Sequence, residues 1–267
     1  MNRLQELFKN KEDICSVYYT AGYPNLDDTM PVLKALEETG VDLVELGMPF
    51  SDPLADGPTI QASSEHALEN GMSIRRLFEQ IKNMRQTITI PVILMGYFNP
   101  VFKYGVEQFI AKCNEVGVDG LIIPDLPFDE YKEKYQQLFD EAGIANIFLV
   151  TPQTSNERIK LIDGHSKGFI YVVSSASVTG AKKDVEKKQV EYFNRVNSLG
   201  LHAPRLIGFG ISNRSTFETA CQHASGAIIG SAFVKLLGEY GPDVLKIKAF
   251  IEEVKGIKSE APSPKSV

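Results

Sequence analysis

Residues 92–123 read VILMGYFNPVFKYGVEQFIAKCNEVGVDGLII, and this stretch contains the unit from which the chain is built. It begins and ends with short apolar runs, Val92–Met95 and Leu121–Ile123, which are typical of parallel strands buried on both faces. Between them, apolar residues recur at spacings of three and four from Val106 to Val116, which predicts an amphipathic helix. Gly117 follows and suits the C-terminal cap of that helix. The stretch therefore predicts a strand, a helix and a second strand.

The same unit recurs along the whole chain. Helical patterns before a glycine also span Asp27 to Glu38, Glu130 to Ala142 and Glu186 to Leu199. The apolar runs are Cys15 to Tyr19, Leu43 to Leu46, Val92 to Met95, Leu121 to Ile123, Ile147 to Val150, Phe169 to Val173, Leu206 to Gly208 and Ala227 to Ile229. Eight such units predict a closed (β/α)8 TIM barrel, with an open doubly wound sheet as the alternative. No GxGxxG follows the first run, which favours the barrel.

The length of 267 residues suits one barrel, since about 250 residues is typical of that fold. We expect a single catalytic domain over residues 1–258, with an extra N-terminal helix in its charged amphipathic first segment. Residues 259–267 are rich in Ser, Pro and Lys without apolar periodicity, which predicts a disordered C-terminal tail.

The composition excludes several classes of protein. Hydrophobic residues make up 43% and charged residues 23%, as in ordinary globular proteins. No apolar run approaches the roughly 20 residues that span a bilayer, and no secretory signal is present, so we expect a cytoplasmic protein without a membrane partner. The net charge is -6 and no basic block stands out, so nucleic acid is not an expected partner.

Cysteine and histidine give no sign of a metal site. Cys15, Cys113 and Cys221 show no CxxC spacing and predict reduced, buried thiols. The histidines are far apart, without HExxH or similar spacing: His66, His165, His202 and His223. We therefore expect no metal.

A loop rich in acids follows the second apolar run. Residues 45–61 read ELGMPFSDPLADGPTIQ. In a barrel the functional loops follow the carboxyl ends of the strands, so this loop lies where chemistry is expected. Glu45, at the end of its strand, is a candidate general acid or base whose pKa burial would raise, and Asp56 lies in a loop near the barrel mouth. The alternatives are a buried ion-pair role for Glu45 and turn formation by Asp52 and Asp56.

Three later loops predict a binding site for a phosphate group. Each places a glycine beside a hydroxyl residue, which lets backbone N–H groups approach an anion. The pairs are Thr179 with Gly180, Gly210 with Ser212, and Gly230 with Ser231. A single pair of this kind would more often be a turn or a helix cap, but barrels commonly bind phosphate in these loops. None of the apolar runs contains a lysine suited to a Schiff base and GxSxG is absent, which leaves acid–base chemistry on a phosphorylated small molecule.

Residues 45–61, together with YTAGYP at 19–24, GFGIS at 208–212 and GSA at 230–232, resemble the tryptophan synthase alpha chain family. The resemblance runs in order from about Leu4 to Ile257. It implies a (β/α)8 barrel lyase, without cofactor or metal, that cleaves indole-3-glycerol phosphate to indole and glyceraldehyde 3-phosphate by a retro-aldol reaction.

The resemblance also implies a role for individual residues. Glu45 matches the acid–base carboxylate, Asp56 the aspartate that binds the indole N–H, and Tyr171, at the end of the sixth strand, a tyrosine beside the reacting centre. Thr179 matches the threonine that closes its loop onto Asp56. Phosphate-binding positions are matched by Gly180, Gly210, Gly230 and Ser231.

Two departures from the family pattern stand out. Tyr18 replaces a common phenylalanine and adds a hydroxyl near the indole pocket. Ser175, Ala176 and Ser177 stand where many members have Arg-Ala-Gly, which removes a cation from the loop after the sixth strand.

The implied partner is the pyridoxal-phosphate-dependent beta chain in an alpha2beta2 complex, which receives indole through a tunnel and holds the cofactor. The loops expected to dock are residues 49–53, 99–102 and 124–128, which contain proline and apolar residues expected to be exposed. Two other functions stay open: a sugar-phosphate isomerase on the same barrel and a non-catalytic regulatory subunit.

Overall fold

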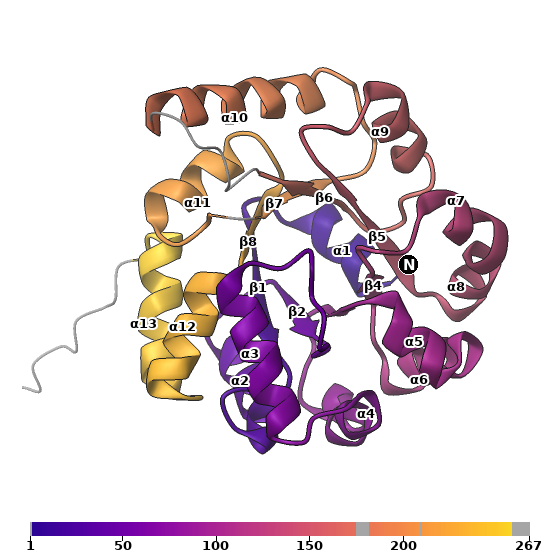
Figure 1. Ribbon diagram of the computed structural model, residues 1–267. Helices are drawn as coiled ribbons and strands as arrows, with labels where there is room; N and C mark the ends of the chain where they lie inside the picture. Colours follow the sequence, from indigo (N-terminus) through magenta and orange to yellow (C-terminus); the bar gives the residue numbers. More distant parts are fainter. Residues whose placement is uncertain (1, 175–181, 209, 258–267) are drawn as a thin grey trace, which may run out of the picture.

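The computed structural model describes residues 2–174, 182–208 and 210–257. Parallel strands close into a barrel in sequence order, with β1 paired to both β2 and β8, and helices surround it (Figure 1). The predicted (β/α)8 barrel is therefore confirmed. The strands are β1 (Ile14–Thr20), β2 (Leu43–Gly47), β3 (Val92–Met95), β4 (Gly120–Ile122), β5 (Ala145–Val150), β6 (Ile170–Val173), β7 (Arg205–Gly208) and β8 (Gly226–Ile229).

Each predicted apolar run overlaps one strand, but several strand ends differ by one or two residues. Hydrogen-bonded pairing continues through residues that are not apolar: β1 reaches Thr20, which pairs with Gly47 at the end of β2. Similarly, β7 begins at Arg205, opposite Ile170. Apolar content marks the buried part of a strand, whereas the pairing with its neighbour sets its length.

The helices form the outer layer. The α-helices are α1 (Arg3–Asn10), α2 (Thr29–Glu38), α3 (Pro58–Glu69), α4 (Ile74–Ile81), α5 (Phe98–Tyr104), α6 (Val106–Val116), α7 (Phe128–Glu130), α8 (Gln136–Ala142), α9 (Asn156–Asp163), α10 (Lys182–Asn197), α11 (Arg214–Cys221), α12 (Ser231–Tyr240) and α13 (Val244–Lys255). Shorter turns of other helix types lie at η1 (Leu26–Asp28), η2 (Met84–Gln86) and η3 (Tyr131–Tyr135).

Three predicted helical segments have wrong boundaries. The one predicted from Glu130 to Ala142 consists of α7, the π turn η3 and α8. The helix predicted to begin at Asp27 begins at Thr29 as α2. Asp27 belongs to the preceding 3-10 turn η1, in which Asp28 accepts a hydrogen bond from the backbone N–H of Asn25. The segment predicted from Glu186 is α10, which starts at Lys182 and ends at Asn197. By contrast, the predicted cap at Gly117 is confirmed, since this glycine has a φ of 80° in the left-handed region and ends α6.

The barrel interior is closed at one end by the predicted extra helix, α1. Its Leu4 is fully buried among inward-facing strand residues such as Leu43 and Ile93, and Phe8 lies 5.6 Å from Phe169 between ring centroids. Figure 1 shows α1 behind the centre of the barrel. Helix α1 covers the end of the barrel where the strands begin, which leaves the end at the carboxyl termini of the strands for a ligand.

The predictions about the cysteines, membrane spans and C-terminal tail have different outcomes. Cys15 and Cys113 are buried, Cys221 is half-buried, and all are free thiols. No helix within the described ranges is both long and apolar enough to cross a membrane. Residues 258–267, which include the predicted tail, lie outside the described residues.

Candidate active site

A cavity of about 450 Å³ opens at the carboxyl ends of the strands. This volume lies in the range of roughly 300–1,000 Å³ that suits a small molecule. The predicted site residues that line it are Tyr18, Glu45, Asp56, Tyr171, Gly210, Gly230 and Ser231. Thr179 and Gly180 lie outside the described residues, as do Ser175, Ala176 and Ser177. Residues from widely separated parts of the chain thus converge on one space.

Glu45 is the most deeply buried of the predicted acids. It is the third of the five residues of β2, and its side chain is fully buried. One carboxyl oxygen, Oε1, accepts a hydrogen bond of 2.9 Å from Ser16 Oγ, and Oε2 has no hydrogen-bond partner among the described residues. Burial raises the pKa of Glu45 from 4.5 to about 8, against the opposing effect of the Ser16 hydrogen bond. Glu45 is therefore a neutral acid at neutral pH.

The raised pKa of Glu45 predicts that this residue destabilises the fold as pH rises. In the unfolded chain the carboxyl group ionises near 4.5, whereas in the folded chain it keeps its proton to about pH 8. Between these values the folded state binds more protons, so the free energy of unfolding falls with pH by up to roughly 1.4 kcal/mol per unit. Glu45→Gln removes this titration. Its unfolding free energy, measured in urea, is expected to exceed that of the parent by a margin that widens from pH 5 to pH 8. A constant margin would contradict the raised pKa.

Asp56 lies in the loop between β2 and α3, where it is partly exposed to the cavity. Its Oδ2 accepts a hydrogen bond of 3.0 Å from the hydroxyl of Tyr97, and that hydroxyl accepts one of 2.9 Å from the backbone N–H of Ala55. Desolvation raises the pKa of Asp56, and the bond from Tyr97 opposes this. Tyr97 was missed from the sequence. Its signal there was its place in the loop after the third apolar run, two residues beyond Met95.

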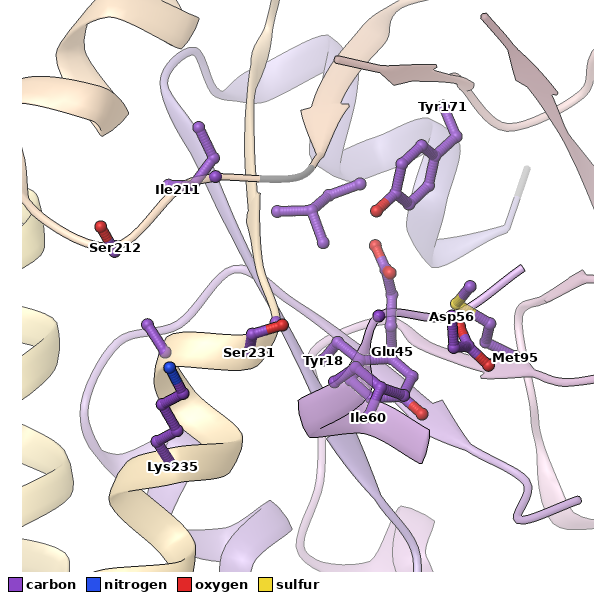
Figure 2. A pocket seen from close by; sticks show the side chains of 15 residues that line it. Tyr18, Glu45, Asp56, Ile60, Met95, Tyr171, Ile211, Ser212, Ser231 and Lys235 are labelled. Carbon is purple, nitrogen blue, oxygen red and sulfur yellow. The ribbon is translucent and has the colours of Figure 1, made fainter. Parts of the chain in front are cut away.

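Tyr171 reaches the cavity from β6, where it is the second of four residues. Its ring occupies space that is free only because position 208 is glycine: a Cβ there would lie 2.1 Å from the Tyr171 hydroxyl oxygen. Burial, with the charges of Glu45 and Asp56, holds the pKa of Tyr171 well above its usual range. Tyr171 is therefore a neutral hydrogen-bond donor. Figure 2 shows its hydroxyl directed toward the carboxyl group of Glu45.

Tyr18 lines the same cavity from β1. Its hydroxyl lies 3.4 Å from Thr20 Oγ1, and burial raises its pKa. A Cβ at Gly47 would lie 2.2 Å from the Tyr18 hydroxyl oxygen, so this glycine leaves room for the phenol. The structure thus places the additional hydroxyl of Tyr18 near Asp56 and Ile60 in the wall of the cavity (Figure 2).

The opposite wall is suited to an anion. Gly210 has a φ of 78°, Gly230 caps α12, and Ser231 is its first residue, so unpaired backbone N–H groups and the positive end of the helix dipole meet here. Lys235, one turn later on α12, also lines the cavity, and it is the one basic side chain among the described lining residues. Sequence reasoning missed Lys235, whose signal was a lysine four residues after the Gly-Ser pair.

The cavity therefore separates charge along its length. Figure 2 shows Asp56 and Met95 on one side, Ser212, Ser231 and Lys235 on the other, and Glu45 between them. Apolar side chains complete the wall, among them Ile60 and Ile228. This arrangement can hold a molecule with an apolar ring and an N–H donor at one end and an anionic group at the other. No cluster of three or more potential metal ligands is found in the parts of the chain that the structure describes.

Comparison with known sequences gives one consistent match. Residues 4–261 match the model of a family described as tryptophan synthase alpha chain. A protein of that name from Flavobacterium psychrophilum is 56% identical over 254 residues, which covers 95% of this chain and all of the relative. Another from Parabacteroides distasonis is 52% identical and covers 96% of this chain and all of the relative.

Comparison with solved structures agrees. A chain of the tryptophan synthase complex from Pyrococcus furiosus aligns with a TM-score of 0.83 at 36% identity, and covers 92% of this chain and 99% of that one. A chain of tryptophan synthase from M. tuberculosis, in an aminoacrylate-bound form, aligns with a TM-score of 0.83 at 30% identity, and covers 95% and 98%. Sequence and fold thus indicate the same relatives.

Proposed function

The chain belongs to the tryptophan synthase alpha chain family, and on this premise we propose how its residues perform the reaction of that family. It is a lyase that cleaves indole-3-glycerol phosphate to indole and glyceraldehyde 3-phosphate, the alpha reaction of L-tryptophan biosynthesis. One observation supports the residue roles best: the same cavity holds Asp56 at one end, an anion-binding wall with Lys235 at the other, and the buried, protonated Glu45 between them.

The substrate fits this cavity in one orientation. The phosphate group is held by the backbone at Gly210 and Gly230 and by Ser231, with Lys235 supplying positive charge. The indole ring then lies among the apolar side chains, and its N–H donates to Asp56. This orientation brings C3 of the indole and the adjacent side-chain carbon to Glu45.

Glu45 carries out both proton transfers in this proposal. Its protonated carboxyl group donates to indole C3, which gives a cationic indolenine that the Asp56 carboxylate stabilises. The ionised Glu45 then removes the proton of the side-chain hydroxyl next to C3. The carbon–carbon bond breaks, its electrons return to the ring to form indole, and the former hydroxyl carbon becomes the aldehyde. Tyr171 donates a hydrogen bond to Glu45 or to the reacting hydroxyl.

Product analysis tests the reaction. The purified chain is mixed with indole-3-glycerol phosphate, with and without a matched beta chain, and equal amounts of indole and glyceraldehyde 3-phosphate are expected. Absence of indole in both mixtures would contradict the assignment. Aldose–ketose interconversion without carbon–carbon cleavage would support the isomerase alternative instead.

Lys235→Met is expected to raise KM by about three- to tenfold with kcat nearly unchanged, since the lysine contributes charge to phosphate binding and lies away from the reacting carbon. Steady-state kinetics at low ionic strength measures this change. The matched control is Lys160→Met, at an exposed lysine on α9 that does not line the cavity. Equal KM values for the two variants would remove Lys235 from the binding site.

Exposed apolar residues near the cavity support assembly with a beta chain. Leu54, after β2, is 92% exposed, and Phe102, on α5, is 63% exposed. The loop after β2, which contains Leu54, contacts the residue before α5, because the rings of Phe50 and Tyr97 lie 5.2 Å apart between centroids. We propose that this surface docks on a pyridoxal-phosphate-dependent beta chain in an alpha2beta2 complex. The cofactor then belongs to the partner, and none is assigned to this chain.

Two expectations about the docking segments are wrong. Residues 99–102 belong to the helix α5 and are not a loop. Within residues 124–128 the large apolar side chains are not exposed, because Leu126 and Phe128 are buried and Phe128 packs 5.3 Å from Phe148 between ring centroids. The exposed anchors are therefore Phe102, in the segment 99–102, and Leu54, one residue beyond the segment 49–53. We also propose a cytoplasmic location, which suits a chain with free thiols.

A further inference from the structure

The hydroxyl group of Ser16 is the one hydrogen-bond donor to Glu45 among the described residues. Ser16 lies on β1 and is fully buried. Strand alternation places it on the same inward face as Tyr18, one inward position deeper in the barrel. It pairs in the sheet with Leu43, two residues before Glu45. A polar residue at this depth is unusual here, since its inward neighbours Ile14 and Leu43 are apolar.

We propose that Ser16 is a positioning residue for the proton transfers of Glu45: its hydroxyl binds Oε1 and thereby leaves Oε2 as the oxygen that carries and exchanges the proton. The proposal rests on the acid–base role of Glu45 given above. It stands on the 2.9 Å bond from Ser16 Oγ to Oε1 and on the absence of a partner for Oε2 within the described ranges.

The physical reason lies in the two oxygens of a carboxyl group. In its protonated form one oxygen carries the proton and the other can only accept. A hydroxyl that donates to Oε1 favours the state in which the proton is on Oε2. After the first transfer the same hydroxyl stabilises the carboxylate, because a hydrogen bond to an ionised group is stronger than one to a neutral group. Ser16 thus fixes the geometry of the acid and also makes it easier to ionise.

Among the residues that the structure describes, no cationic side chain beside Glu45 performs this role in place of Ser16. The titratable groups that line the cavity with Glu45 are Tyr171 from β6, Tyr18 from β1 and Asp56 from the loop after β2, whereas the pKa of Glu45 itself is raised by burial and lowered by the hydrogen bond from Ser16. Met95 and Ile228 contribute apolar surface from β3 and β8, and Lys235 lies at the far end of the cavity. Within the described residues, Ser16 is therefore the side chain whose direct bond favours the carboxylate form.

The experiment uses three variants of the full chain with a matched beta chain: Ser16→Ala, and the equally sized pair Ser16→Thr and Ser16→Val. Threonine keeps the hydroxyl and valine replaces it with a methyl group, so any effect of added volume is common to both. For each variant kcat and KM are measured from pH 6 to pH 10, and infrared difference spectra follow the carboxyl band that Glu45→Gln abolishes. Thermal unfolding identifies any variant that does not fold.

Loss of the hydroxyl is expected to lower kcat about tenfold, leave KM within about twofold, and move the titration of the Glu45 band upward by about one pH unit. These changes should occur in Ser16→Ala and Ser16→Val, and Ser16→Thr should restore parental behaviour. If Ser16→Val and Ser16→Thr behave alike, or if Ser16→Ala leaves both kcat and the titration unchanged, the proposal is wrong. An active Glu45→Gln variant would instead overturn the acid–base role of Glu45. The failure of that role can therefore be distinguished from the failure of the Ser16 proposal.

Discussion

Glu45→Gln is expected to lower kcat by about 10²- to 10⁴-fold, the range attributed to a positioned general acid or base. Glutamine has the same shape but can neither donate a proton to indole C3 nor remove one from the hydroxyl. Because Glu45 is fully buried and accepts only the hydrogen bond from Ser16 among the described residues, the amide should fit without moving the strands.

Binding separates the loss of chemistry from the loss of the fold. Affinity for a non-cleavable indole-alkyl phosphate should stay within about tenfold of the parent, or roughly 1.4 kcal/mol. Glu65→Gln, an exposed carboxylate on α3 outside the cavity, is the matched control and should keep parental kcat. Turnover by Glu45→Gln close to that of this control would exclude Glu45 as the acid.

The parent enzyme should also show the titration of Glu45 in its rates. The reaction begins with the protonated acid, whose pKa is raised to about 8 by burial. Activity that requires this form is present below that value and is lost as pH rises through it, so kcat/KM should fall above about pH 8. A basic limb that is absent up to pH 9.5 would show that the protonated form is not the one required.

Asp56→Asn is expected to lower kcat/KM by about 100-fold, mainly through kcat. The amide oxygen can still accept the indole N–H, so binding of the ring persists. What is lost is the negative charge that stabilises the cationic indolenine, and in a cavity of low polarity such a charge has a large effect.

Two controls separate charge from geometry at this position. Asp52→Asn changes an exposed aspartate of the same loop, hydrogen-bonded to Ser51, and should leave activity unchanged. Tyr97→Phe removes the hydroxyl that bonds to Asp56 but keeps the carboxylate, so it should lower activity less than Asp56→Asn. If Tyr97→Phe equals or exceeds the loss in Asp56→Asn, the position of Asp56 matters more than its charge.

The link through Tyr97 also relates the chemistry to the docking surface. Its hydroxyl bonds to Asp56 and its ring contacts Phe50, in the segment after β2 that we expect to meet the beta chain. A partner that presses on Leu54 or Phe50 could therefore shift Asp56. Replacing Phe50 with leucine should then weaken activation by the beta chain more than it weakens activity of the isolated chain.

The barrel could be predicted from the sequence, since strands buried on both faces must be apolar throughout and amphipathic helices must cover them. This requirement applies within each segment, so it can be recognised without knowing which other segments lie beside it in the fold. The sequence also indicated Glu45, Asp56 and the Gly230–Ser231 pair, because acids after an apolar run and glycines beside hydroxyls are local patterns.

The contacts between side chains from different strands could be seen only in the folded chain. Ser16 meets Glu45 because β1 pairs with β2 in a register that places both on the inward face, and Tyr171 reaches the cavity because Gly208 on the neighbouring strand leaves space. Tyr97 bonds to Asp56 across 41 positions of sequence. Such contacts depend on closure of the barrel and on strand register, which bring distant residues within a few ångströms. No local pattern in the chain contains that information.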